Sequence, residues 1–175
     1  MTTRILVTYA TKAGSTQGVA EAIGKTLSTS DTNVIVLPME QVRYLSTYDA
    51  VVAGSAIRGQ KWLPEALQFL RQHQAELAGK PFAAFMVCIT LSMKGAEQYR
   101  EGLKAWMQPV RNLVQPLSEG YFAGALDFSK LPFTPNVLAM RMVAASGTWK
   151  VGDHRDWDAI SSWAQKLLPL LARRR

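Results

Sequence analysis

The sequence predicts an α/β fold built on a doubly wound, five-stranded parallel sheet with the strand order 2-1-3-4-5. Three observations favour this fold: the predicted strands are apolar throughout and do not alternate with polar residues, they alternate along the chain with segments of helical spacing, and the chain has 175 residues. Continuous apolar strands are typical of a parallel sheet that helices cover on both faces. Right-handed crossovers and this length favour the order 2-1-3-4-5 over a six-stranded dinucleotide-binding sheet.

The apolar runs predict five strands, at residues 4–9, 33–38, 48–55, 82–89 and 121–128. Apolar residues at helical spacing predict helices over 16–28, from Pro64 onward, over 99–117 and from about Asp153. Pro109 is expected to kink or divide the third of these helices. Asp153 and Asp156 form a capping-box-like arrangement and are expected to cap the last helix, with Trp157 on its inner face.

One domain is expected over residues 1–175, with an inserted apolar segment at about 129–150. The stretch from Leu131 to Gly147 is too long for a plain connection, and Arg141 is the only charge in its helical part. This segment either packs as a lid or homodimer contact, or dips into a membrane face and meets a quinone or porphyrin. Packing is favoured, because short apolar helices are more often buried.

Amino-acid composition limits the cellular compartment and the binding partners that we expect for the protein. Cys88 is the only cysteine, so an internal disulfide is excluded, and the start of the chain lacks the pattern of a signal peptide. We therefore expect a cytoplasmic protein, with peripheral contact to the inner membrane face as an option. The net charge of +7 allows contact with acidic proteins, anionic lipid or nucleic acid, but no specific nucleic-acid binding is expected.

The segment YATKAGSTQGVA, residues 9–20, carries the clearest chemical signal. Three hydroxyl residues, a glycine and a lysine follow the first predicted strand and open the first predicted helix. A helix N-terminus offers free N–H groups and a partial positive charge, so this loop is suited to a phosphate. The candidate residues are Thr11, Lys12, Ala13, Gly14, Ser15 and Thr16. The alternative is an ordinary turn with a hydroxyl N-cap.

This loop resembles the phosphate loop of flavodoxins, with a hydroxyl, two residues, Gly, any residue and Thr. The resemblance extends to AGSAIRGQKW at 53–62, YFAGALDF at 121–128, RMVAASG at 141–147 and GDHRDW at 152–157. Together these segments are similar to the flavodoxin-domain group that contains the menaquinone-dependent protoporphyrinogen dehydrogenases. The strand order predicted above is also the flavodoxin-like order.

The resemblance implies FMN as the cofactor, with the phosphate held by the loop at 11–16. It places the isoalloxazine ring between the loops after the third and fourth strands. The implied ring contacts are Ser55, Ala56, Ile57 and Arg58 from the first of these loops, and Thr90, Leu91, Ser92 and Met93 from the second. Arg58 or Lys94 could stabilise an anionic reduced flavin, or each could be a solvated surface charge.

Trp62 is a candidate aromatic wall for the flavin, and the alternative is packing on the next helix. The loop after the fourth strand has no aromatic residue, so one face of the ring is expected to be open to a substrate. Cys88 is interpreted as a core residue, and the separated His73 and His154 predict no metal site.

Three functions follow from these observations. The first is an FMN-dependent oxidoreductase that passes electrons from an organic donor, with protoporphyrinogen as a candidate, to a quinone-like acceptor. FMN would perform its chemistry, so no catalytic side chain is named. The second is a non-enzymatic flavodoxin-type electron carrier, and the third is a flavodoxin-like module that has lost FMN. The basic charge departs from the acidic surface usual for flavodoxin shuttles.

Overall fold

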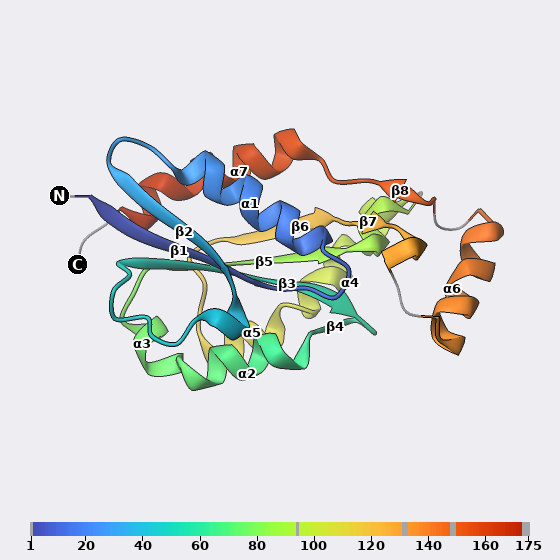
Figure 1. Cartoon of the computed structure of the whole chain (residues 1–175), viewed down its shortest axis with the longest axis horizontal. Coiled ribbons are helices and arrows are strands. Elements are labelled where there is room, and N and C mark those ends of the chain that lie inside the picture. Colours follow the sequence, from blue (N-terminus) through green and yellow to red (C-terminus); the bar gives the residue numbers. More distant parts are fainter. Residues whose placement is uncertain (1, 94, 131–132, 148–149, 173–175) are drawn as a thin grey trace.

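The computed structural model describes residues 2–93, 95–130, 133–147 and 150–172. Its main sheet contains five parallel strands in the order β2-β1-β3-β5-β6, which confirms the predicted order 2-1-3-4-5 (Figure 1). The bounds of these strands are β1 Thr3–Ala10, β2 Thr32–Pro38, β3 Ala50–Arg58, β5 Phe82–Cys88 and β6 Glu119–Ala123. The fold is therefore flavodoxin-like.

Three short strands accompany the main sheet, and two of them, β4 and β8, were not predicted. β4 (Lys61–Trp62) turns back antiparallel onto the end of β3, through a two-residue turn in which Gly59 and Gln60 both have positive φ. Such left-handed turns match the twist of a β-hairpin. β7 (Ala125–Leu126) and β8 (Gly152–Asp153) pair antiparallel in a small sheet of their own. The apolar segment expected at about 129–150 lies between β7 and β8.

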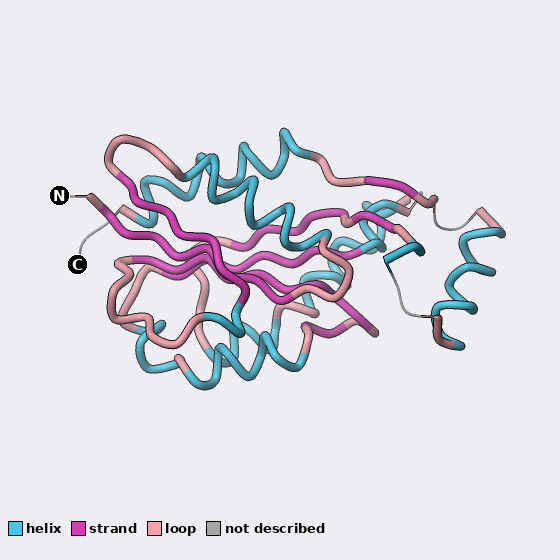
Figure 2. The backbone as a smooth tube through the Cα atoms, in the orientation of Figure 1, coloured by secondary structure: helices cyan, strands magenta, loops and turns pink. Residues whose placement is uncertain are grey.

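Helices cover both faces of the main sheet (Figure 2). α1 (Ser15–Leu27) and α7 (Trp157–Leu171) pack together on one face. On the other face lie the remaining sheet-covering helices: α2 (Pro64–Gln72), α3 (Gln74–Ala78), α4 (Arg100–Ala105) and α5 (Gln108–Leu113). α6 (Pro135–Ala145) stands away from these layers, beyond the carboxyl ends of the strands.

The centre of the sheet is fully covered, because every residue of β5 is buried. Gly54 of β3 is required there, since a Cβ at this position would overlap the ring of Phe85 on β5. That ring is in turn held by Phe122 and Trp163, at centroid distances of 6.2 Å each. The Phe85 ring can therefore lie over β3 only because position 54 has no side chain.

The predicted helix over 99–117 is divided into α4 and α5, as Pro109 led us to expect. Pro109 lies in the first turn of α5, where a missing N–H removes no intrahelical hydrogen bond. The predicted strand at 121–128 is also divided, since β6 ends at Ala123 and β7 begins after Gly124.

The prediction for the start of the last helix was right for one aspartate and wrong for the other. Asp156 is the N-cap of α7, and its Oδ1 accepts a hydrogen bond from the Ala159 N–H at 2.9 Å. Asp153 lies in β8 instead and pairs with Arg155, because the antiparallel ladder with β7 extends to this residue. Trp157 is 42% exposed and does not lie on the inner face.

Candidate functional site

The carboxyl ends of the parallel strands open into a cavity of about 1200 Å³. Its walls come from the loop after β1, the β3–β4 hairpin, the end of β5 and its following turn, the α4 region, β7 and α6. The lining residues are Thr11, Lys12, Ala13, Ser15, Ala56, Ile57, Arg58, Gly59, Gln60, Val87, Cys88, Ile89, Thr90, Met93, Tyr99, Gly102, Leu103, Trp106, Gly124, Ala125, Leu126, Asp127, Thr134, Asn136, Val137 and Met140. Segments far apart in the sequence thus share one site.

The loop from Thr11 to Thr16 has the geometry of an anion-binding helix start. Gly14 adopts a left-handed conformation, with φ of 85°, and its N–H donates to Thr11 Oγ1 at 3.0 Å. No described side chain caps α1, and its first turn contains no acidic residue. The first N–H groups of the helix therefore remain available to an anion.

Thr16 provides the test of whether this loop fits a phosphate. Its side chain is fully buried, and Thr16, like Gly14, is not among the residues that line the cavity. Its Oγ1 has no hydrogen-bond partner within the described part of the chain. A buried hydroxyl without a partner is costly, so an acceptor arriving at the loop would satisfy it. Hydroxyls and backbone N–H groups are the donors that phosphates prefer here, so the residues fit the phosphate of FMN.

Lys12 lies in the cavity wall, but its charge is already engaged. Its Nζ contacts Glu65 Oε1 at 2.6 Å, and this hydrogen bond lowers the pKa of the Glu65 carboxyl. The lysine was expected to add charge to the phosphate site. In this structure it joins the phosphate loop to the first turn of α2 instead.

The four residues predicted as the loop after the third strand are the last residues of β3 itself. Ala56, Ile57 and Arg58 line the cavity, as the ring site requires. Ser55 does not, because it is fully buried: its Oγ accepts from the Leu63 N–H at 3.0 Å and donates to the Ala56 carbonyl at 2.8 Å. Ser55 fastens the hairpin to the start of α2.

The loop after β5 begins as a 3-10 turn over Ile89–Ser92. Thr90 and Met93 line the cavity. Leu91 packs against the core, and Ser92 Oγ donates to the Ile89 carbonyl at 2.6 Å, so these two residues shape the turn from outside the cavity. Lys94, the other candidate for charge near the ring, falls outside the described residues.

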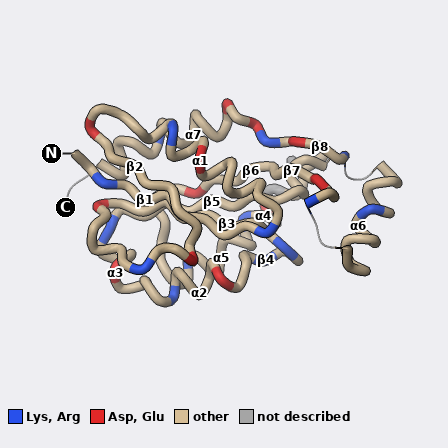
Figure 3. Tube along the Cα trace, viewed as in Figure 1, with Lys and Arg blue, Asp and Glu red and all other residues tan. Residues whose placement is uncertain are grey.

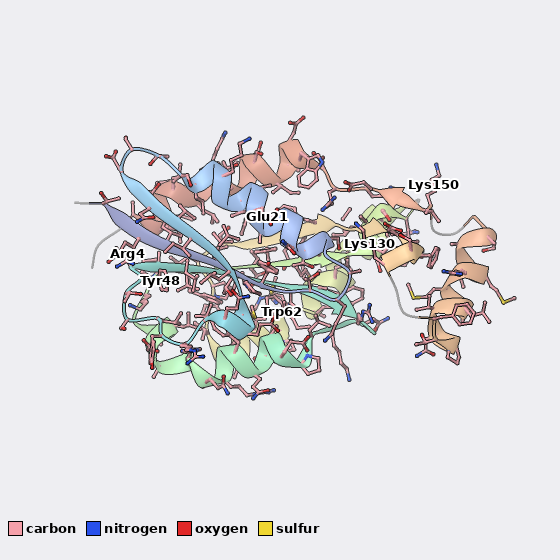
Figure 4. The ribbon with its side chains drawn as sticks, viewed as in Figure 1. Arg4, Glu21, Tyr48, Trp62, Lys130 and Lys150 are labelled. Carbon is pink, nitrogen blue, oxygen red and sulfur yellow. The ribbon has the colours of Figure 1, made fainter. Side chains whose placement is uncertain are left out.

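Trp62 is 2% exposed and belongs to the core between the sheet and α2 (Figure 4). It does not line the cavity, so its predicted place as an aromatic wall is corrected to that of a core residue. The aromatic walls are Tyr99 and Trp106, on either side of α4. Their helical spacing predicted one long helix over 99–117 that includes both residues, and nothing in that spacing indicated that they line a cavity.

Cys88 is buried at the end of β5, where its side chain belongs to the core and also borders the cavity. Burial raises the pKa of its thiol to about 11, so the thiol is protonated at neutral pH. His73 lies near Glu76, at 3.2 Å, and His154 contacts the Lys150 carbonyl at 2.6 Å. No group of three metal-ligating side chains occurs among the described residues.

This architecture has known counterparts. The family profile described as the flavodoxin domain matches residues 6–150, which is most of the chain. The chain belongs to the flavodoxin-domain family. FMN is the cofactor of this family, and the loop around Thr16 fits its phosphate. The protein is therefore an electron-transfer flavoprotein.

One curated relative is the protoporphyrinogen IX dehydrogenase [quinone] of Leishmania major, which is 23% identical over 95% of this chain and 75% of the relative. Among solved structures, a short-chain flavodoxin associated with a PDU bacterial microcompartment has a TM-score of 0.61 and 14% identity, covering 97% of this chain and 99% of that chain. Flavodoxin 2 from Bacillus cereus has a TM-score of 0.55 and 22% identity, covering 92% and 94%. These structural likenesses concern the fold.

Proposed function

We propose that this flavodoxin-domain protein is an FMN-dependent oxidoreductase that passes electrons from an organic donor to a quinone-like acceptor. The observation that carries the proposal is the extent of the cavity, which runs from Thr11, Lys12, Ala13 and Ser15 of the phosphate loop to α6. A one-electron shuttle needs only an exposed ring edge. A cavity that is also walled by the α4 region, β7 and α6 has room for a small-molecule substrate beside the cofactor.

Part of the cavity wall away from the phosphate loop is apolar, although Asp127, Thr134 and Asn136 also line the cavity near α6. Leu103 and Trp106 contribute from the α4 region, and Val137 and Met140 from α6. Apolar and aromatic walls of this kind suit a flat, lipophilic ring such as a quinone or a porphyrin. A lipophilic substrate of this kind therefore suits the apolar walls of the α4 region and α6, which would not contact the phosphate of FMN.

FMN, when bound, supplies two-electron redox chemistry between donor and acceptor. The chain's own residues bind and orient it. The phosphate would be held by Thr11, Ser15, Thr16 and the backbone of the loop, and the ring by Ala56, Ile57, Thr90 and Met93. Arg58 adds positive charge at the end of β3, where it would favour a reduced, anionic ring.

The acceptor and donor classes are supported by the Leishmania major relative, whose name states a protoporphyrinogen substrate and a quinone. We propose menaquinone-like molecules as acceptors and protoporphyrinogen as the candidate donor. Quinones of this class reside in membranes, so a membrane contact is part of the proposal. We propose a peripheral contact made by exposed apolar side chains. No described helix is long and apolar enough to cross a bilayer.

α6 and the residues before it provide the surface for this contact. Phe133 and Met142 are 81% and 71% exposed, and Leu138 and Val143 are exposed as well. Lys130, Arg141 and Lys150 are the only charged residues from 128 to 152, so the segment is purely basic (Figures 3 and 4). Apolar side chains flanked by cations suit an anionic lipid surface.

Vesicle flotation tests the membrane contact. Leu138→Asp with Met142→Asp should abolish binding to vesicles that contain anionic lipid, and flotation equal to that of the unaltered protein would refute it. Both side chains are exposed, so folding should be unaffected. Loss of a dimer in the same variant, seen by light scattering, would show instead that α6 is a contact between two copies of the chain.

The oxidoreductase itself is tested with the purified FMN-loaded protein. Reduced under anaerobic conditions, it should be reoxidised rapidly by menadione, a soluble menaquinone analogue. In its oxidised form, and with excess menadione as the acceptor, it should oxidise protoporphyrinogen to fluorescent protoporphyrin, a six-electron oxidation that reduces three molecules of menadione in three cycles of the flavin. Reoxidation by menadione no faster than that of free FMN would overturn the proposed quinone acceptor. Failure with protoporphyrinogen alone would remove only that donor.

The second candidate is a non-enzymatic electron carrier, which membership of the flavodoxin-domain family supports. Its distinguishing result is rapid one-electron exchange with a protein such as ferredoxin, together with no turnover of small substrates. A colourless protein that also fails to bind added FMN would contradict both candidates.

A further inference from the structure

Arg155 connects two parts of the molecule that lie far apart in the sequence. It follows β8, and its Nη1 donates a hydrogen bond to the carbonyl of Ser15, in the first turn of α1, at 3.3 Å. The Arg155 side chain is only 18% exposed. A surface arginine would be expected to point into solvent, so this contact with the phosphate loop calls for an explanation.

The guanidinium is fixed by three further contacts. Its Nε and Nη2 donate to the two carboxylate oxygens of Asp153, at 2.8 and 2.6 Å, and its Cζ lies 4.5 Å from the centre of the Trp157 ring. A bidentate pair combined with a stacked ring holds the planar group in one orientation. The hydrogen bond to Ser15 is therefore made by a preorganised donor.

α1 has a matching recess. A Cβ at Gly18 would overlap Nη1 of Arg155, so only glycine at this position allows the guanidinium to lie against the helix. Gly18 follows Ser15 and Thr16 within the same turn of α1, whose N–H groups form the proposed phosphate site. The recess and the arginine together fix the backbone that would meet the phosphate.

We propose that Arg155 is a positioning residue for the FMN phosphate: by binding the Ser15 carbonyl in the recess at Gly18, it holds the first turn of α1 in the phosphate-binding conformation. The proposal rests on FMN binding, which is part of the proposed function. Its support is the Arg155–Ser15 hydrogen bond, the bidentate pair with Asp153 and the close approach at Gly18.

The test compares FMN with riboflavin, which has the same ring and ribityl chain but no phosphate. Arg155→Met should weaken FMN binding to the apoprotein about tenfold or more, the usual effect of losing a charge-assisted hydrogen bond. Riboflavin affinity should stay within about twofold. Arg4→Met is the matched control, because Arg4 lies beside Tyr48 at the opposite end of β1 (Figure 4).

Gly18→Ala is a second, independent variant. It displaces the guanidinium while leaving its charge in the protein, and alanine favours a helix more than glycine does. We expect the same selective loss of FMN affinity in a chain that stays folded, as checked by circular dichroism. A purely structural role for Arg155 would lower thermal stability without changing the ratio of FMN to riboflavin affinity.

Two results would overturn the proposal. Equal weakening of FMN and riboflavin binding in Arg155→Met would mean that the arginine affects binding of the isoalloxazine ring, through the small sheet of β7 and β8, and not binding of the phosphate. No weakening of either would mean that the contact with Ser15 has no part in binding. If the unaltered protein itself binds no FMN, the proposed function fails first, and that result is seen before any variant is made.

Discussion

Replacing Thr16 with valine should have opposite effects on the apoprotein and on FMN binding. The Thr16 hydroxyl is fully buried, and no partner for it exists among the residues described. Leaving such a group unsatisfied costs roughly 1–3 kcal/mol, and valine has nearly the same shape without the hydroxyl. We therefore expect Thr16→Val to raise the free energy of unfolding of the apoprotein by about 1 kcal/mol. For a chain of this size, the midpoint would rise by about 2–4 °C.

FMN binding should change in the other direction. A hydrogen bond from a hydroxyl to a charged phosphate contributes about 1.5–3 kcal/mol, so its loss should raise the Kd of FMN roughly 10- to 100-fold. At an FMN concentration of about 1,000 times the original Kd, FMN stabilises the protein by about 4.1 kcal/mol. A tenfold weaker variant would keep about 2.7 kcal/mol of this stabilisation.

The assay is thermal unfolding with and without FMN, together with titration of FMN fluorescence. Thr8→Val is the matched control, because the Thr8 hydroxyl is also buried and lacks a described partner, but Thr8 lies within β1 and not in the first turn of α1. It should stabilise the apoprotein and leave FMN affinity unchanged. The reasoning is refuted if Thr16→Val destabilises the apoprotein while FMN affinity stays the same.

Three further predictions concern the framework of the site. Gly54→Ala should destabilise the protein by about 1–3 kcal/mol in urea unfolding, because the new Cβ overlaps the held ring of Phe85; no loss would mean that this ring can move. Cys88 should react with iodoacetamide only slowly at pH 7 and faster as the pH approaches about 11, the raised pKa of its buried thiol; rapid labelling at pH 7 would contradict this. Burial opposes ionisation of Glu119, but hydrogen bonds from Arg111 and Tyr121 outweigh burial and lower the pKa of the carboxyl. The contribution of Glu119 to stability is therefore present above the unfolded pKa of about 4.3, and it is lost as the pH falls through the lower pKa of the folded state. Glu119→Gln should therefore unfold more easily than the unaltered protein at pH 7, with a difference that shrinks in acid, and a difference independent of pH would refute it.

The sheet could be predicted from the sequence because its signal is local. Each apolar run is long enough for a buried strand, and the alternation with helical spacing restricts the order of the strands. The phosphate loop was also local, since hydroxyls, Gly14 and the helix start are neighbours in the chain. The division at Pro109 was accessible for the same reason.

The features that the sequence did not reveal depend on contacts between distant segments. Trp62 was taken for a cavity wall because a tryptophan near a ligand loop fits either role, and only packing against the sheet decides between them. Asp153 was assigned to a helix cap because the strands β7 and β8 that pair at this residue have only two residues each, which is too short for a recognisable strand pattern in the sequence. Likewise, the contact between Arg155 and Ser15 spans 140 positions.

The antiparallel pairing of β7 with β8 has a consequence for how this family can change. Leu126 at the end of β7 pairs with Gly152 at the start of β8, so the two ends of the intervening segment, residues 127–151, lie side by side. This segment can therefore vary in length without shifting a strand of the main sheet. Arg155 and the loop at Thr11–Thr16 lie outside this segment. Exchanging it between family members would thus alter which molecules can reach the flavin and leave the means of holding the cofactor in place.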